Sequence, residues 1–233
     1  MQDLKPNEQR SQNAIILIWI ALAMNCISLI SSYFQYDLLQ TAANGGEIST
    51  EYATSNDNRE QAIGIIQIIV FVVSALTFIQ WFRRAYFNLH LRINHLSHSE
   101  GWAAGCWFMP IVNLFRPYQI MKELFQETQL FLKRNEVHSS EHLAMPSLSL
   151  WWTFWIIDRF FGQLAFKYAM KAETIEELTR STIGQIISNA IGIVLAIITI
   201  NTITEYSKLE LVMHKVKITE EDSAPAVESF PTS

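Results

Sequence analysis

The sequence predicts an all-α membrane protein with four transmembrane helices, a cytoplasmic re-entrant or interfacial elbow, and an amphipathic helix. Half of the 233 residues are hydrophobic and the mean hydropathy is +0.15, which is high for a soluble domain. The apolar residues are gathered in long runs, and four runs have the roughly 20 residues needed to cross ~30 Å of hydrocarbon. Residues 13–216 are therefore predicted to form a single integral membrane domain.

The predicted spans cover approximately residues 14–34, 61–82, 148–170 and 182–203. The first run is longer than the ~7–15 residues of a signal-peptide core, which favours an uncleaved anchor over the alternative of a cleaved signal. Residues 1–12 are polar and form the predicted cytoplasmic N-terminus, and residues 35–60 are predicted to be a solvated loop, partly disordered or helical. Residues 217–233 are acidic, contain Pro and Ser, and are predicted to be a disordered cytoplasmic tail.

A short apolar stretch, residues 101–116, is the predicted elbow. It has about 15 apolar residues where a span needs about 20. Gly101, Gly105 and Pro110 also make a continuous helix unfavourable. Because irregular backbone at membrane depth needs hydrogen-bond partners, we expect the elbow to pack against the spans rather than face lipid, its glycines allowing close approach.

The amphipathic helix is predicted over residues 117–134. Pro117 suits the first helical position, where its missing N–H has no partner to lose. Its apolar face recurs at three- and four-residue spacing and comprises Ile120, Met121, Leu124, Thr128, Phe131 and Leu132. We expect this helix to lie in the membrane interface or to pack on the bundle.

The distribution of Lys and Arg indicates whether the elbow crosses the membrane. If it does not cross, one side holds 12 basic residues: Lys5, Arg10, Arg83, Arg84, Arg92, Arg116, Lys122, Lys133, Arg134, Lys208, Lys215 and Lys217. The other side then holds 4: Arg59, Lys167, Lys171 and Arg180. If the elbow crosses, the division becomes 8 against 8. Because basic residues are concentrated on the cytoplasmic side, the sequence predicts a non-crossing elbow with both termini cytoplasmic.

Two segments together resemble a known bacterial family. They are Phe78–Leu89 and Gly101–Tyr118, followed by Glu123-Leu124. The matching positions are Trp81, Arg84, Asn88, Gly101, Trp102, Gly105, Trp107, Pro110, Asn113 and Pro117. The order of these residues resembles the multi-pass membrane family catalogued as domain of unknown function 4328, over most of residues 60–205. The resemblance implies a bacterial multi-pass membrane protein and brings no known activity.

Six polar residues are candidates for a site. Arg84, Asn88, Asn113 and Arg116 are predicted to converge where the elbow meets the second span, either binding a lipid headgroup or satisfying the backbone of the elbow. Asp158 and Arg159 lie inside the third span, where a charge costs about 2.5–3.5 kcal/mol. They are predicted to clamp helices together, with an ion or proton path as the alternative, and to have different partners.

Other chemistry finds little support in the sequence. His95, His98, His138 and His142 are predicted to be surface histidines rather than metal ligands, and no cofactor or nucleic-acid motif is present. Cys26 and Cys106 are predicted to be small buried side chains. Amide side chains in the spans are predicted to hydrogen-bond between helices; these are Asn25, Gln67, Gln163, Asn189 and Asn201.

Two functional hypotheses follow. The first is a non-enzymatic scaffold or sensor of the bacterial inner membrane whose elbow binds lipid or a membrane protein, including a second copy of the chain. The second is a small oligomeric transporter or channel that uses Asp158 and the elbow arginines. An intramembrane enzyme is the least favoured, since the sequence has no recognisable nucleophile motif.

Overall fold

The computed structural model describes residues 4–137 and 145–216, and every regular element within these residues is helical. The four long helices are α1 (Glu8–Ala43), α2 (Thr50–His90), α5 (Met145–Ala169) and α6 (Ile175–Lys215). Between α2 and α5 lie the short α3 (Trp102–Gly105), the 3-10 turns η1 (Cys106–Phe108) and η2 (Val112–Leu114), and α4 (Arg116–Arg134). The all-helical prediction is confirmed for these residues. The predicted disordered tail lies outside them.

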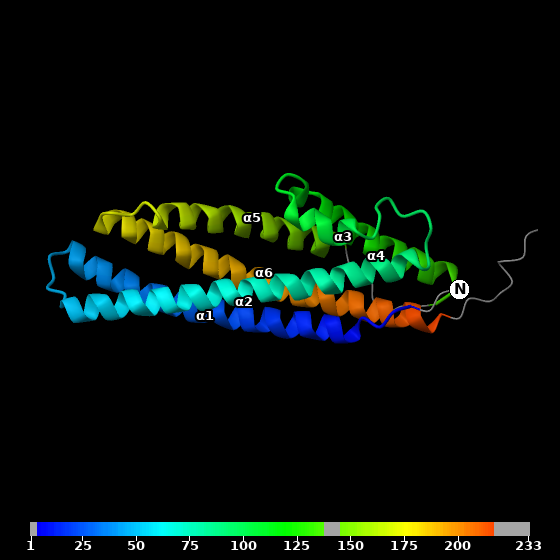
Figure 1. The fold of residues 1–233 in the computed structure, drawn as a ribbon, viewed down its shortest axis with the longest axis horizontal. Coiled ribbons are helices and arrows are strands. Elements are labelled where there is room, and N and C mark those ends of the chain that lie inside the picture. The colour runs from blue at the N-terminus through cyan, green and yellow to red at the C-terminus, as the bar shows by residue number, and fades with distance from the viewer. Residues whose placement is uncertain (1–3, 138–144, 217–233) are drawn as a thin grey trace, which may run out of the picture.

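The long helices run side by side as an elongated bundle (Figure 1). α1 packs against both α2 and α6, and α6 packs against α5, so α1 and α6 form the inner pair. The connections at residues 44–49 and 170–174 lie together at one end, called here the hairpin end. The opposite end, the terminal end, carries the start of α1, the ends of α2 and α6, and α4.

Within the part of the chain that the structure describes, three helices are long and apolar enough to cross a membrane: α1, α2 and α6. At 1.5 Å per residue a 41-residue helix such as α2 is about 60 Å long, which is roughly twice the hydrocarbon thickness of a bilayer. α5 has 25 residues, carries Asp158, Arg159 and Lys167, and is not among the three. Length and composition therefore support a membrane protein with three membrane-capable helices.

Helix continuity explains the short connections at the hairpin end. Of the predicted loop 35–60, only residues 44–49 lie between the two helices. The Ser49 hydroxyl accepts a 3.2 Å hydrogen bond from the Tyr52 N–H and begins α2, while Gly45 takes a φ of 78°, which suits glycine. α6 begins with a capping box in which Thr174 and Glu177 bond each other's backbone N–H groups.

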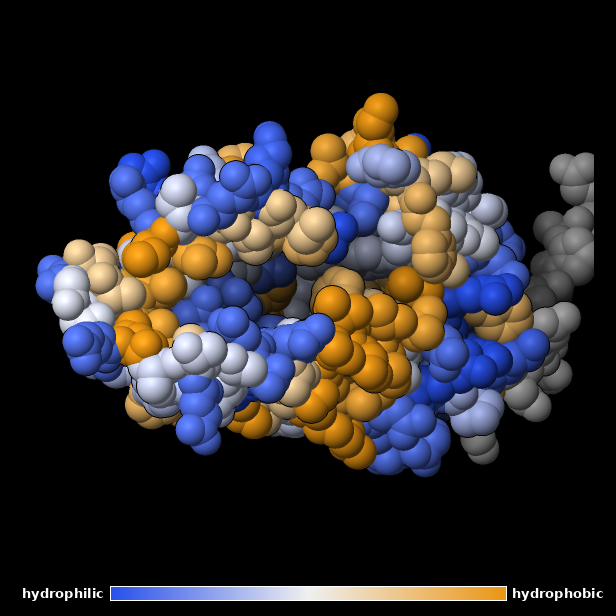
Figure 2. All heavy atoms as spheres, turned by 60° about the vertical axis from the view of Figure 1, so that its left-hand side comes forward, coloured by the Kyte–Doolittle hydropathy of each residue, from blue (hydrophilic) through white to orange (hydrophobic). Residues whose placement is uncertain are grey.

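The bundle is apolar on its outer surface and well packed at its terminal end. The large exposed side chains of α2 include Ile65, Ile68, Ile69, Phe71 and Val72. Figure 2 shows apolar side chains gathered in a broad patch on one face of the molecule. Among the described residues, the fully buried aromatic side chains instead belong to the core near the terminal end and are Trp81, Phe82, Tyr86, Phe125, Trp151 and Tyr206.

Candidate functional site

A buried polar cluster, the terminal cluster, joins three segments at the terminal end. It consists of the buried side chains of Asn7, Asn88 and Glu210 together with the backbone of Lys5. The Asn88 amide donates to Glu210 Oε1 at 2.6 Å and to the Lys5 carbonyl at 2.8 Å, and its oxygen accepts the Lys5 N–H at 3.0 Å. Asn7 donates to Glu210 Oε2 at 2.9 Å. Because the Glu210 side chain is buried, its carboxylate depends on these two amides for hydrogen bonds.

A second cluster, the elbow clamp, holds the start of α4 against α2. The Tyr86 hydroxyl donates to Glu123 Oε2 at 2.6 Å, and the Ser97 N–H donates to Glu123 Oε1 at 2.6 Å. His98 Nδ1 lies 3.2 Å from Glu123 Oε2, and His98 Nε2 contacts the Arg116 guanidinium. Since Arg can only donate, this arrangement fits a neutral imidazole with its proton on Nδ1.

Hydrogen bonding sets the ionisation of the Glu123 carboxyl. Burial alone would raise its pKa, but the hydrogen bonds from Tyr86, Ser97 and His98 outweigh burial and lower the pKa. Arg116 also lies over the Trp102 ring, 5.5 Å from its centroid. The clamp is therefore a charge-assisted chain that runs from a guanidinium through an imidazole to a carboxylate.

The elbow itself has a packed base and an exposed tip. At the base, the Trp107 ring contacts Phe78 and Phe82 of α2 and Trp155 of α5, with centroids 5.5–6.3 Å apart. At the tip, the exposed apolar side chains are Phe108, Met109, Ile111, Leu114 and Phe115, with Ile111 76% exposed. In Figure 1 this tip projects sideways from the bundle beside the first turns of α5.

One expectation about the elbow holds only in part, and another is wrong. The elbow is expected to pack against the spans, and its base does so through Trp107, whereas the apolar side chains at its tip are exposed. Its glycines were expected to allow close approach, yet a Cβ placed on Gly101 or Gly105 would meet nothing within 4 Å. The elbow's packing comes from the large Trp107 ring.

A third cluster, the polar layer, crosses the middle of the bundle. The Gln67 amide of α2 donates to Asn25 Oδ1 of α1 at 2.9 Å and to Asn189 Oδ1 of α6 at 3.0 Å. Asn189 in turn donates to the Ser28 hydroxyl at 2.9 Å. The prediction that Asn25, Gln67 and Asn189 bond between helices is confirmed.

The remaining predicted amides behave differently. Gln163 and Asn201 are exposed, and the structure gives neither of them an inter-helix hydrogen bond within residues 4–137 and 145–216.

The two cysteines are both free thiols. Cys106 is buried as predicted, and burial raises the pKa of its thiol to about 12, while Cys26 is half-buried. The Cys106 thiol is therefore unreactive while the elbow stays packed.

The six predicted site residues do not form one site, although Arg84 and Asn88 both act on Glu210, the first through its charge and the second through a hydrogen bond. Asn88 belongs to the terminal cluster and Arg116 to the elbow clamp. Arg84 lies over the Phe87 ring at 5.8 Å, and the side-chain Oδ1 of Asn113 is buried without a hydrogen-bond partner among the described residues. Asp158 borders the polar layer, and Arg159 lies over Trp155 at 5.7 Å.

Most of the aromatic residues and one proline of the matching motif contribute to packing, and Trp102 is among those packed against the core. Trp81 is fully buried against Phe78 and Tyr206, and Trp107 forms the base of the elbow. Pro117 is buried at the first turn of α4, as its position predicted. Pro110 is exposed at the elbow tip.

Several residues of these clusters were not predicted. His98 was expected at the surface, but its side chain is only 11% exposed because Glu123 and Arg116 enclose it; the prediction is wrong for this residue. Glu210 was overlooked, although it falls between Tyr206 and Met213, four residues after one and three before the other, on a buried helix face. That spacing is the signal that would have identified it. His138 and His142 lie outside the described residues.

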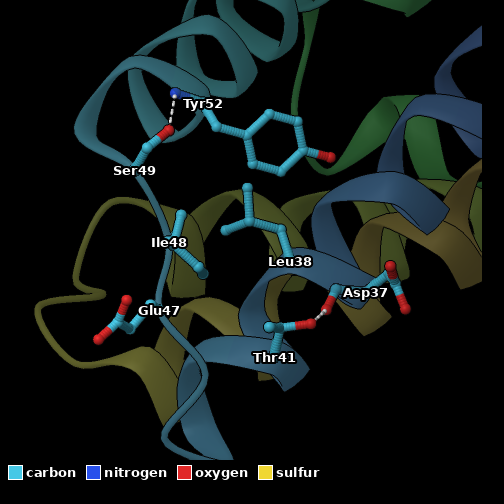
Figure 3. Close-up of a pocket in the computed structure, with 7 residues that line it drawn as sticks. All are labelled: Asp37, Leu38, Thr41, Glu47, Ile48, Ser49 and Tyr52. Carbon is cyan, nitrogen blue, oxygen red and sulfur yellow. Dashed lines mark hydrogen bonds between the residues drawn. The ribbon is translucent and has the colours of Figure 1, made fainter.

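A shallow depression at the hairpin end is open to solvent and has a volume of about 370 Å³ (Figure 3). Its lining comprises Asp37, Leu38, Thr41, Glu47, Ile48, Ser49 and Tyr52. The Ser49 hydroxyl is used in capping α2, and the Thr41 hydroxyl donates to the Asp37 carbonyl at 3.0 Å. None of the predicted site residues lines it.

The comparisons with known proteins agree with the motif. Residues 44–208 match the family described as a domain of unknown function (DUF4328). No curated protein and no solved structure matches the chain. The matched segment contains α2, the elbow, α4, α5 and most of α6, and it begins directly after α1.

Proposed function

The chain belongs to this family, and we propose that it is a multi-pass protein of the bacterial inner membrane, acting as a non-enzymatic scaffold or sensor with a membrane-dipping elbow. The observation that carries the proposal is the elbow's exposed apolar tip, held by a polar clamp beside a group of tryptophans. Tryptophan is enriched at membrane–water interfaces, where its ring has an apolar and a wet side. The elbow then lies in the cytoplasmic leaflet at interface depth.

The proposed topology has four spans, with α5 as the third in chain order. α5 packs along α6 and is joined to it by residues 170–174 at the hairpin end. A helix that lies alongside a spanning helix in a bundle shares its membrane depth, even with Asp158 and Arg159 in its sequence. The α1–α2 connection lies at the same end, so the elbow begins and finishes on the terminal side without crossing.

Charge supports the assignment of the terminal side to the cytoplasm. With a non-crossing elbow, the terminal side holds 12 of the basic residues and the hairpin side 4. Basic residues near span ends are retained on the cytoplasmic side. Both termini are therefore proposed to be cytoplasmic.

The scaffold role follows from how the elbow is built. α4 buries Ile120, Met121 and Leu124 against the bundle and leaves a polar face toward the cytoplasm. Arg116 at the start of α4 contacts the clamp, while the neighbouring Phe115 belongs to the exposed tip. A change at the membrane surface is thereby connected to the position of α4, which is what a surface sensor requires.

Reporter fusions test this topology. Fusions of a cytoplasm-active fluorescent protein and of a periplasm-active phosphatase are placed after residue 216, after residue 172 and after residue 46. The proposal expects cytoplasmic activity for the first position and periplasmic activity for the other two. A periplasmic signal at residue 216, or a cytoplasmic signal at residue 172, contradicts the four-span arrangement.

A small oligomeric transporter or channel is the second candidate. The observation that favours it is Asp158, a carboxylate beside the polar layer that interacts with the charge of Arg159 but has no hydrogen bond among the described residues. Arg84 and Arg116 have their own surroundings near the terminal end, so this candidate rests on Asp158 rather than on the elbow arginines. A structural clamp would instead be expected to pair the carboxylate directly.

A further inference from the structure

Four basic side chains gather at the terminal end, where the start of α1 meets the end of α2. They are called here the basic cluster and are Lys5, Arg10, Arg83 and Arg84. Lys5 Nζ lies 4.5 Å from the centroid of the Phe87 ring, and the Arg84 guanidinium lies 5.8 Å from the same centroid. The Arg10 guanidinium donates to the Gln80 carbonyl of α2 at 3.4 Å. Charges from two segments far apart in the chain are therefore held together.

The charges of the basic cluster act on one another. The pKa of Arg10 is lowered by burial and, in addition, by repulsion from Arg84 and Arg83. Repulsion among like charges opposes the folded arrangement of these side chains. An anion that binds between them would relieve this repulsion and stabilise the arrangement.

Carboxylates balance only part of this positive charge. Glu100 lies 3.9 Å from Arg83, at the limit of an ion pair, and both side chains are largely exposed. Glu210 is buried, and its two oxygens already accept hydrogen bonds within the terminal cluster. The exposed Glu8 accepts a hydrogen bond from Gln12. Among the described residues, Arg83 with Glu100 is the only ion pair that involves the basic cluster, so positive charge remains in excess at this surface.

The backbone beneath the basic cluster is fixed by the terminal cluster. The Lys5 N–H and carbonyl both bond the Asn88 side chain of α2, at 3.0 and 2.8 Å. The side chains of Lys5 and Arg84 are thereby carried on segments that are already positioned, and a positioned site loses less conformational entropy when it binds. Guanidinium groups present a planar fork of donors that matches phosphate oxygens.

The position of the basic cluster on α2 indicates the source of such an anion. Exposed apolar side chains follow one face of the helix at three- and four-residue spacing and are Ile65, Ile69, Val72 and Leu76. Arg83 follows Leu76 by seven residues and lies on the same face. From Ile65 to Arg83 the helix rises about 27 Å, close to the ~30 Å thickness of the hydrocarbon layer. An acyl chain against this face would place its headgroup at the basic cluster.

We propose that the basic cluster binds the phosphate headgroup of an acidic phospholipid whose acyl chain lies along α2. Arg83 and Arg84 donate to the phosphate oxygens, and Lys5 and Arg10 add positive charge beside them. Basic pockets on the cytoplasmic side of transmembrane helices bind such headgroups. The inference rests on the proposed topology for the choice of leaflet. Its test measures lipid binding without regard to orientation, so failure of the site and failure of the topology give separate results.

Native mass spectrometry of the full chain, released from micelles that contain phosphatidylglycerol or phosphatidylcholine, counts bound lipids and tests the site. One phosphatidylglycerol should be retained per chain, with at least fivefold higher affinity than phosphatidylcholine. Lys5→Gln combined with Arg83→Gln should reduce this preference at least threefold. The matched control is Lys133→Gln combined with Arg134→Gln, which also removes one Lys and one Arg, here from the exposed end of α4, and should retain the preference.

Three outcomes overturn the proposal. Equal affinity for the two lipids would show that acyl chains alone are bound. Equal losses in the two double variants would show that general surface charge attracts the lipid. Displacement of the lipid by inorganic phosphate at matched ionic strength would show that the basic cluster takes the free anion. If the double variant does not assemble, Arg83→Gln alone replaces it, because this guanidinium is exposed, and should lower the preference about twofold; an unchanged preference contradicts the site.

Discussion

The Asn88 amide donates a 2.6 Å hydrogen bond to the Glu210 carboxylate, linking α2 to α6 across 122 positions of the chain. The same side chain exchanges two hydrogen bonds with the Lys5 backbone, so it also fixes the segment that precedes α1. One asparagine thereby holds three segments together at the terminal end. Removing it would leave a buried carboxylate with fewer donors, which is costly in an apolar interior.

Asn88→Leu should therefore destabilise the bundle by about 1.5–3 kcal/mol, the range for a hydrogen bond to a charged group. Unfolding in mixed micelles, followed by circular dichroism, measures the change. Asn201→Leu is the control. Asn201 is exposed on α6, the helix that carries Glu210, so its replacement should change the free energy of unfolding little. Equal destabilisation by the two variants would show that the terminal cluster contributes nothing specific.

The double variant Asn88→Leu with Glu210→Leu separates lost bonding from buried charge. Replacing both partners by apolar residues removes the uncompensated carboxylate, so the double variant should be more stable than Asn88→Leu alone. A double variant at least as unstable as Asn88→Leu would mean that packing rather than charge dominates at this position. The same micelle unfolding assay measures both.

The elbow clamp should control access to Cys106. This thiol is fully buried, so in a Cys26→Ala background the chain should react slowly with maleimide reagents at neutral pH. Glu123→Gln weakens the bonds from Tyr86, Ser97 and His98 and should raise the labelling rate by about tenfold, which corresponds to ~1.4 kcal/mol of easier opening. Glu136→Gln, an exposed change beyond α4, should leave the rate unaltered.

Acid should open the elbow as Glu123→Gln does. Because the pKa of Glu123 is lowered in the folded chain, its stabilising contribution is complete above the ordinary value of about 4.5 and is lost as pH falls through the lowered value. Labelling of Cys106 with dithiodipyridine, which reacts with thiols in acid, should therefore accelerate below about pH 4.5 in the wild-type elbow. In Glu123→Gln this acceleration should be much smaller. An equal acceleration in the two proteins would mean that protonation of groups other than Glu123 opens the elbow in acid.

Polar contacts between residues far apart in the chain could not be predicted from the sequence. The apolar runs and the face of α4 predicted the helices, because those signals are local and periodic. The partners of His98 and Glu210 were not predictable in this way, since each depends on residues that the fold brings from other helices. The inter-helix role of Gln67 was predictable because an amide within a span has few alternatives to a neighbouring helix.

The elbow illustrates a different limit. Its composition predicted irregular backbone, and the 3-10 turns η1 and η2 agree with that expectation. The direction of its tip depends on φ and ψ angles at single residues, such as the extended ψ of 114° at Met109, and composition does not determine these angles. Glycine content likewise suggested close packing at Gly105, whereas Gly192, in an ordinary helical run, has the tighter surroundings.

The elbow tip should lie within the cytoplasmic leaflet. In a chain lacking native cysteines, Ile111→Cys labelled with bimane should be quenched strongly by lipids brominated near the headgroup end of the acyl chain. Quenching should be weaker with bromine near the chain terminus, because the tip occupies the interface rather than the bilayer centre. Asn94→Cys, in the exposed polar turn after α2, is the control and should show little quenching by either lipid. Equal, weak quenching at both positions would place the tip in water.

Gly192 and Gly105 should respond oppositely to alanine. A Cβ at position 192 would lie 2.7 Å from Asn25 Nδ2, closer than real contacts allow, so Gly192→Ala must displace Asn25 from its hydrogen bond with Gln67. Overpacking of this kind costs about 1–3 kcal/mol. Gly105 has a helical φ of −65° and no atom within 4 Å of an added Cβ, so Gly105→Ala should be neutral or stabilise by up to about 1 kcal/mol through lower backbone entropy in the unfolded chain. Unfolding in mixed micelles compares the two variants directly, and greater destabilisation by Gly105→Ala would contradict the close approach of α1 to α6 at the polar layer.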